Sequence, residues 1–146
     1  MFIKTEAEMR IFLDANILFS AAAPDSSTRA FLNIILRHAK AVTNEHAWEE
    51  ARRNVELKRP HLIAALNNLK PEIEFSDRFM AVDCPVLPDK DRPIIGGAAA
   101  SRCTHLWTGD KRHFGPLYGH TIESVKIVSG VMLADEISKK GWCHDR

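Results

Sequence analysis

The sequence predicts a single three-layer α/β domain in which helices flank a parallel central sheet. Short apolar segments of strand type alternate along the chain with longer segments whose apolar residues recur at helical spacing. The length of 146 residues is that of one domain, and the sequence holds no internal repeat or low-complexity stretch. Such an alternation within one domain is typical of parallel strands joined by crossover helices.

The first half of the chain is predicted to contain two strands and four helices. In order, these are a loosely ordered lead-in over 1–9, a strand over 10–14, helices over 16–23 and 28–40, a strand over 41–43, and helices over 45–58 and 60–69. Ser26 or Ser27 is the expected cap of the second helix and Asn44 that of the third, because such side chains accept hydrogen bonds from a first helical turn. Pro71 ends the fourth helix.

The second half is predicted to contain three strands and two helices. They are a strand over 79–83, a helix over 94–103, strands over 104–108 and 124–128, a helix over 130–139, and a tail over 140–146. Gly96 and Gly97, followed by three alanines, allow the first of these helices to pack closely on the sheet. Gly141 is expected to stop the last helix.

Composition narrows the possible classes of function. The chain carries 27% charged and 45% hydrophobic residues, and its net charge of +1 provides no general basic field for nucleic acid. Any binding of nucleic acid therefore depends on a local patch. The apolar run 11–23 contains Asp14 and Asn16 and follows a polar start, which argues against a signal peptide or a membrane span. Cys84, Cys103 and Cys143 are an odd, widely spaced set, which favours reduced thiols in a cytoplasmic protein over a zinc site.

Four acidic residues are expected to meet at one edge of the sheet. Asp14 and Asp110 each follow a strand, while Glu50 and Asp91 lie in the first turns of helices. The carboxyl ends of parallel strands and the starts of their crossover helices share one edge, where ligands bind. Four carboxylates there would repel one another by a few kcal/mol per close pair. The cluster is therefore expected to bind a hard divalent cation.

Glu49 competes with Glu50 for the second position in this cluster. Taking Ala47, Trp48 and Ala51 as part of the buried helix face, Glu50 falls roughly 115° and Glu49 roughly 145° from its centre at 100° per residue. Glu50 is nearer the core boundary and is the preferred candidate, by a narrow margin.

The segments around these acids resemble PIN-domain nucleases. The resemblance lies in IFLDANILFS (11–20), EEARR (49–53), DKDRPII (89–95) and WTGDKRHF (107–114), in the family's order across nearly the whole chain. It implies a Rossmann-like parallel sheet and a Mg²⁺- or Mn²⁺-dependent nuclease that cuts single-stranded or structured RNA, leaving a 5′-phosphate and a 3′-hydroxyl. Many small members are VapC-type toxins of toxin–antitoxin pairs, so an antitoxin partner is also implied.

The resemblance assigns roles to particular residues. The family's acidic quartet falls on Asp14, Glu50, Asp91 and Asp110, and its supporting polar residues on Asn16 and Thr108. The three aspartates are the expected metal ligands, and Glu50 is expected to orient or deprotonate the attacking water, or to hold a second ion. Lys111, Arg112 and His113 are candidates to hold a substrate phosphate, although an exposed polar turn explains them equally well.

Other readings of the same residues remain open. Asp91 also suits a cap for a helix that starts at Arg92–Pro93, and Glu50 suits a solvated helix face. A phosphotransferase of the haloacid dehalogenase type needs a second aspartate where Asn16 stands, and a receiver domain needs paired acids before its first helix. Within the PIN family, an RNA-processing factor or a catalytically silent RNA- or protein-binding module is the alternative to a toxin.

A homodimer is also expected. Two-fold dimers are the commonest oligomers, and Trp48, Phe79 and Trp142 are candidates for an exposed interface. The PIN-domain resemblance points the same way, because it implies an RNA groove lined by both subunits.

Overall fold

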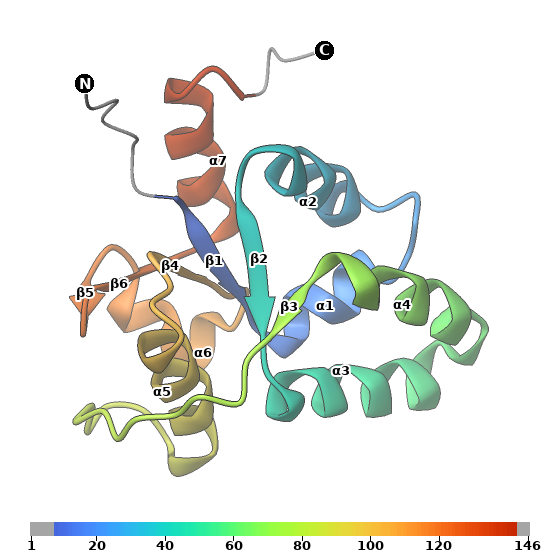
Figure 1. The fold of residues 1–146 in the computed structure, drawn as a ribbon. Helices are drawn as coiled ribbons and strands as arrows, with labels where there is room; N and C mark the ends of the chain where they lie inside the picture. The colour runs from blue at the N-terminus through green and yellow to red at the C-terminus, as the bar shows by residue number, and fades with distance from the viewer. Residues whose placement is uncertain (1–7, 143–146) are drawn as a thin grey trace.

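The computed structural model describes residues 8–142, which fold around one six-stranded sheet with the strand order β3-β2-β1-β4-β6-β5 (Figure 1). The strands are β1 (Arg10–Leu13), β2 (Lys40–Thr43), β3 (Glu74–Phe75), β4 (His105–Trp107), β5 (Thr121–Ile122) and β6 (Val125–Val128). All neighbours pair in parallel except β5 and β6, which form an antiparallel edge. The predicted α/β class with a parallel central sheet flanked by helices is confirmed.

Seven α-helices connect or follow these strands within the described range. They are α1 (Ala15–Ala21), α2 (Ser27–His38), α3 (Glu45–Lys58), α4 (Ile63–Leu69), α5 (Arg92–Ala100), α6 (Lys111–Phe114) and α7 (Gly130–Lys139). Single 3-10 turns lie at Pro60–Leu62, Lys70–Glu72, Asp89–Asp91 and Gly115–Leu117.

The helices cover both faces of the sheet and produce three layers. On one face, Phe31 of α2 packs edge-on against Trp107 of β4, and Trp142, just beyond α7, stacks on His38 of α2. On the other face, α5 lies so close to β1 that a Cβ at Gly97 would sit 3.6 Å from the Phe12 ring. Strand β1 is central and its residues Ile11, Phe12 and Leu13 are fully buried.

The helix boundaries follow the capping residues. Ser26 accepts a hydrogen bond from Arg29 N–H, Asn44 from Ala47 N–H, and Ser129 from Met132 N–H. These side chains satisfy amide donors that have no partner inside the helix. The predicted caps Ser26 and Asn44 are confirmed, and α3 and α7 have the predicted bounds. Gly141, with φ of +81°, follows the end of α7.

The strand predicted over 79–83 is wrong. The third strand of the sheet is the two-residue β3, after which the Ser76 N–H still donates to the Thr43 carbonyl at 3.0 Å, and residues 77–88 belong to no strand. The segment runs along α5 instead, where the Met80 N–H donates to the Gly96 carbonyl at 3.3 Å, and Val82 is buried while Phe79 is 59% exposed. A Cβ at Gly96 would lie 2.4 Å from the Met80 carbonyl oxygen, so only glycine permits this approach of the segment to α5.

Two further expectations concern the ends and the surface. The lead-in over 1–9 and the tail over 140–146 fall mostly on residues 1–7 and 143–146, which lie outside the described range. Trp48 is not an exposed interface residue, because it is 2% exposed and packs edge-on against Phe75. Across residues 8–142, no helix has the length and apolar character needed to cross a membrane.

Candidate active site

The acidic residues singled out in the sequence lie at the carboxyl edge of the sheet. Asp14 directly follows β1, and Asp110 follows β4 after the Thr108–Gly109 turn. Asp91 directly precedes α5, and Glu50 lies in the second turn of α3. Because α3 and α5 both begin at this edge, the strand ends and the helix starts bring carboxylates from four separate parts of the chain into one region.

Asp14 is the most buried carboxylate of the group, with 6% of the residue exposed. Its Oδ1 accepts the Ala15 N–H at 2.7 Å, and its Oδ2 accepts the Thr108 hydroxyl at 2.7 Å. Burial raises the pKa of Asp14 from 3.8 to about 6 against these hydrogen bonds, and the charges of Glu50 and Asp91 raise it further. Because its charged form is unfavourable in this environment, the Asp14 carboxylate would be stabilised by a nearby positive charge.

Thr108 and Asn16 connect Asp14 to the loop that carries Asp110. The Thr108 hydroxyl donates to Asp14 and accepts the Asp110 N–H at 3.1 Å. The Asn16 amide donates to Asp14 Oδ2 at 3.3 Å, and its oxygen accepts the Gly109 N–H at 2.7 Å. These bonds fix the turn after β4 relative to the end of β1.

Asp91, Asp110 and His113 form a compact group of possible metal ligands. One ligand atom from each of the three lies within 4.8 Å of the others. His113 Nδ1 is 2.9 Å from Asp110 Oδ2 and 3.1 Å from Asp91 Oδ2. Ionised carboxylates only accept hydrogen bonds, so this nitrogen carries the proton when both acids are charged. His113 thus lies between two carboxylates, and Asp14 lies deeper than this group.

Asp91 does not cap its helix through its side chain. It occupies the position before α5, but its carboxylate makes no capping hydrogen bond. Its Oδ2 is buried and, among described residues, has no partner with hydrogen-bond geometry. Burial raises the pKa of Asp91, as do the charges of Asp110 and Glu50, while His113 and Lys90 lower it. A buried carboxylate oxygen without a hydrogen-bond donor is a suitable ligand for a cation.

The two glutamates of α3 lie in different environments. Glu50 is exposed to solvent while Glu49 is half-buried, so the expectation that Glu50 lies nearer the core boundary is wrong. The charge of Glu50 nevertheless raises the pKa of both Asp14 and Asp91. Glu49 pairs with Arg52 at 2.7 Å, one turn along the same helix. Glu50 is therefore the glutamate within electrostatic reach of the buried aspartates.

Two basic residues follow Asp110 directly in the chain, and one aromatic residue is anchored to the same loop. Lys111 and Arg112 are exposed in α6, directly after Asp110. Tyr118, which sequence reasoning did not identify, donates its hydroxyl to the Thr108 carbonyl at 2.9 Å. Burial raises the pKa of Tyr118, as do the charges of Asp110 and Asp14. No local motif marks Tyr118, because its role depends on the turn between α6 and β5.

Comparison with known proteins gives matches in structure alone. No protein-family model matches the chain, and no curated protein matches its sequence. A chain of the DNA-bound VapBC2 complex from Rickettsia felis matches with a TM-score of 0.63 at 16% identity, and a chain of DNA-bound VapBC from Salmonella typhimurium with 0.57 at 15%. Both matches cover 83% of this chain and 98% of the other.

A third match is VapC20 of Mycobacterium tuberculosis, described as a toxin that cleaves the sarcin–ricin loop. Its TM-score is 0.51 at 8% identity, over 77% of this chain and 98% of that one. At these identities the comparison shows the fold. The predicted likeness to VapC-type PIN domains is confirmed at that level, and the acidic group lies at the carboxyl edge of this fold.

Proposed function

We propose that this protein is a divalent-metal-dependent endoribonuclease that hydrolyses phosphodiester bonds in single-stranded RNA, as the toxin of a toxin–antitoxin pair. The observation that carries the proposal is the convergence of Asp14, Asp91 and Asp110 at one edge of the sheet, with the pKa of Asp14 and of Asp91 raised. The shared fold with VapC chains, including one described as an RNA-cleaving toxin, supports it.

The donor set suits a hard cation. Asp91 and Asp110 supply carboxylate oxygens at the surface of the site, Asp14 supplies a deeper one, and the Asp91 oxygen without a hydrogen bond is available as a ligand. Mg²⁺ or Mn²⁺ held there would polarise a phosphoryl oxygen and lower the pKa of bound water. His113 must release Asp91 and Asp110 or become a ligand itself when such an ion binds.

The remaining residues have distinct tasks in this proposal. Glu50, exposed yet close enough to affect Asp14 and Asp91, orients or deprotonates the attacking water. Lys111 and Arg112 hold phosphates of the RNA strand beside Asp110. Thr108 and Asn16 keep the Asp14 carboxylate in position through the hydrogen bonds described above. Each task belongs to a side chain that the fold brings to the same edge.

We also propose two protein partners. VapBC neighbours are complexes, which supports a cognate antitoxin for this chain. A two-fold homodimer is the proposed state of the free protein, with the exposed Phe79 as an interface candidate. A monomer in light scattering at tens of micromolar would count against the dimer without affecting the nuclease proposal.

Cleavage of an RNA panel tests the proposed activity. With Mg²⁺ or Mn²⁺, the protein should cut single-stranded RNA internally and leave duplex DNA largely intact, and EDTA should stop cutting. The panel includes transfer RNA and ribosomal RNA fragments, because structured targets are within the proposed substrate class. Asp14→Asn should abolish cutting while the circular dichroism spectrum stays that of a folded protein.

The same variant provides the control for contamination. If Asp14→Asn cuts as well as the wild type, the activity belongs to another ribonuclease and the assignment fails. Expression of the wild type in a host without the antitoxin should slow growth, and Asp14→Asn should restore it. Cleavage without any effect on growth would favour an RNA-processing factor over a toxin.

A further inference from the structure

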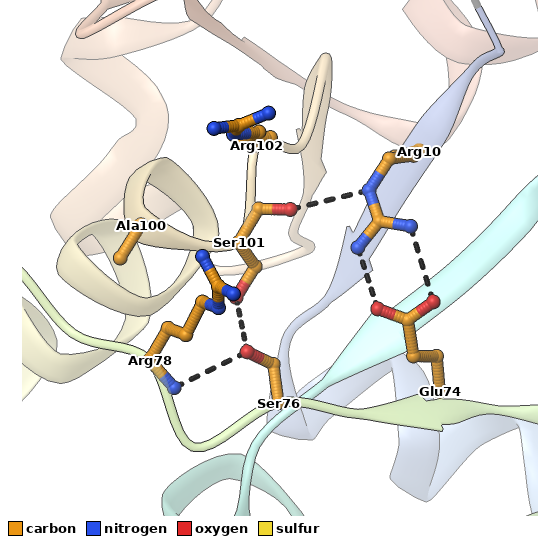
Figure 2. A pocket seen from close by; sticks show the side chains of 7 residues that line it. All are labelled: Arg10, Glu74, Ser76, Arg78, Ala100, Ser101 and Arg102. Carbon is orange, nitrogen blue, oxygen red and sulfur yellow. Dashed lines mark hydrogen bonds and ion pairs between the residues drawn. The ribbon is translucent and has the colours of Figure 1, made fainter.

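A cavity of about 400 Å³, shown from close by in Figure 2, lies beside the C-terminal end of α5. It is lined by Arg10, Glu74, Ser76, Arg78, Ala100, Ser101 and Arg102. Asp91 precedes α5 and Ser101 follows it, so at 1.5 Å per residue the two places are roughly 15 Å apart along the helix axis. Nothing in the proposed nuclease mechanism uses this cavity.

Arg10 and Glu74 form the wall of the cavity on the side of the sheet. Arg10 reaches Glu74 with both terminal nitrogens, at 3.1 Å and 2.6 Å, and its Nε donates to the Ser101 carbonyl at 3.1 Å. This bidentate pair is structural, since it joins β1, β3 and the end of α5. The Glu74 carboxylate is thereby neutralised by Arg10.

Arg78 and Arg102 supply the unbalanced charge. Both line the cavity from the side of α5 and the segment after β3, and both residues are exposed (Figure 2). Neither guanidinium has an ion pair or side-chain hydrogen bond with another residue in the range 8–142. Three guanidiniums against one carboxylate leave two positive charges on the cavity wall.

The serine pair adds a neutral donor at the same place. Ser76 Oγ and Ser101 Oγ lie 2.7 Å apart, and Ser76 Oγ also accepts the Arg78 N–H at 3.2 Å. The Ser101 hydroxyl donates its hydrogen to Ser76 Oγ. The Ser76 hydroxyl hydrogen has no acceptor within the described part of the chain, so it is available to a ligand.

The backbone at Arg102 supports a role for its side chain. Arg102 has φ of +58° where the chain leaves α5, a conformation in which glycine is the usual residue. A glycine would satisfy the same turn without strain. Arginine there adds a charged side chain to the cavity at the expense of some backbone strain.

We propose that this cavity binds a phosphate monoester through Arg78, Arg102 and the free serine hydroxyl. A phosphate monoester carries close to two negative charges at neutral pH and three acceptor oxygens, which match one hydroxyl donor and two guanidiniums that have no partner among residues 8–142. Planar guanidiniums bind phosphate oxygens in pairs. The ester belongs either to a free small molecule or to the 5′ end of a nucleic-acid strand.

Binding is tested by calorimetric titration of the full chain in EDTA, where no cleavage occurs. The probes are inorganic phosphate, adenosine 5′-monophosphate, adenosine, and a single-stranded DNA hexamer with and without a 5′-phosphate. Phosphate and the monophosphate should bind and adenosine should not. The double variant Arg78→Gln/Arg102→Gln should weaken binding by roughly a hundredfold, since each of the two charge-assisted contacts is worth about a factor of ten.

A matched control removes the same charge elsewhere. Arg37 and Arg53 are exposed and have no ion pair with other residues of the described range, so Arg37→Gln/Arg53→Gln should leave binding unchanged. Equal affinity of the Arg78/Arg102 variant and the wild type, or no binding of any phosphorylated probe to the wild type, overturns the proposal. Preference for the phosphorylated hexamer over adenosine 5′-monophosphate identifies a strand end as the source; the reverse identifies a free molecule.

Amide chemical shifts locate the site independently of affinity. Addition of inorganic phosphate should move the amide signals of Ser76, Ser101 and Arg102 and leave those of α6 in place. Shifts confined to Lys111 and Arg112 would assign phosphate to the acidic edge and overturn the proposal. The test is separate from the nuclease assignment, because Asp14→Asn should bind phosphate as the wild type does.

Discussion

The carboxylates at the two ends of α5 are held in opposite ways. At its start, burial raises the pKa of Asp14 and of Asp91, and neither carboxylate forms an ion pair with an arginine or lysine among the described residues, although the charge of Lys90 lowers the pKa of Asp91. At its end, the bidentate hydrogen bonds from Arg10 lower the pKa of Glu74. The charged forms of Asp14 and Asp91 are therefore less stable in the folded protein than in water, whereas the charged form of Glu74 is more stable.

The direction of the pKa shift distinguishes carboxylates of a ligand-binding site from a carboxylate in a structural ion pair. A fold gains nothing from charged carboxylates that are desolvated and repel one another, so their presence together indicates a ligand that compensates them. A paired carboxylate such as Glu74 needs no ligand. At the end of α5, the unbalanced groups are instead Arg78 and Arg102, which is why the proposed ligand there is an anion.

The largest expected effect distinguishes the two glutamates of α3. Glu50→Gln should lower kcat/KM for RNA by about a hundredfold or more, because the amide cannot accept a proton from the attacking water. Glu49→Gln should change it by less than about threefold, since Glu49 pairs with Arg52 and contributes as a surface ion pair. Single-turnover cleavage measures both variants. The reverse ranking would move the catalytic role to Glu49.

The next effect concerns the pH dependence of stability at the acidic edge. The folded-state pKa of Asp14, about 6, exceeds its ordinary value of 3.8, so its contribution to stability is greatest below 3.8 and is lost as the pH rises through about 6. Charging Asp14 in the metal-free protein at about pH 8 therefore costs on the order of 3 kcal/mol, and roughly half of that at about pH 5.

Asp14→Asn does not titrate and isolates this effect. In EDTA, the free energy of unfolding of Asp14→Asn should exceed that of the wild type by the largest amount at about pH 8. This difference should shrink as the pH falls to about 5. Denaturant titrations at several pH values measure the difference. A difference independent of pH would mean that Asp14 is not desolvated as described.

Metal linkage gives a smaller effect at the same edge. Millimolar Mg²⁺ or Mn²⁺ should raise the melting temperature of the wild type by several degrees, because an ion that binds only the native state stabilises it. Asp91→Asn should raise the melting temperature in EDTA, where the pKa of Asp91 shows that its charge is unfavourable, and should reduce the response to metal. Identical wild-type melting curves with and without metal would remove the metal-site argument.

The position of the aspartates at one edge of the sheet could be predicted because it depends on short sequence segments. Asp14 and Asp110 each follow a short buried strand, and the direction of the parallel sheet then places them at one edge. The helices α3 and α7 were also predictable, since the cap Asn44 marks the start of α3 and Gly141 follows the end of α7, and both signals are local in the sequence. The segment 79–83 failed because an extended apolar run packs on a helix as readily as in a sheet.

The rest of both sites depends on long-range packing. The position of His113 between Asp91 and Asp110 requires the relative placement of α5 and α6, and Tyr118 reaches Thr108 from a turn whose path no motif specifies. The arginine cavity joins residues from β1, the segment after β3 and the end of α5. Isolated arginines spread over more than ninety positions give no pattern in the sequence.

The smallest expected effect belongs to the structural pair at the end of α5. Glu74→Gln should lower the free energy of unfolding by under about 1 kcal/mol at neutral pH, because the Glu74 side chain is 43% exposed and solvent screens its interaction with Arg10. The lowered pKa of Glu74 means that this contribution is present above its ordinary value of 4.5 and is lost as the pH falls through the folded-state value. The loss should therefore disappear in acid. Its sign is opposite to that of Asp14→Asn, which should be more stable than the wild type at high pH.

Glu72→Gln is the matched control, since Glu72 lies 4.0 Å from Arg29 and is 52% exposed, and it should change stability less than Glu74→Gln. A loss of several kcal/mol for Glu74→Gln, or the same pH trend as Asp14→Asn, would show that the two ends of α5 are not held in opposite ways.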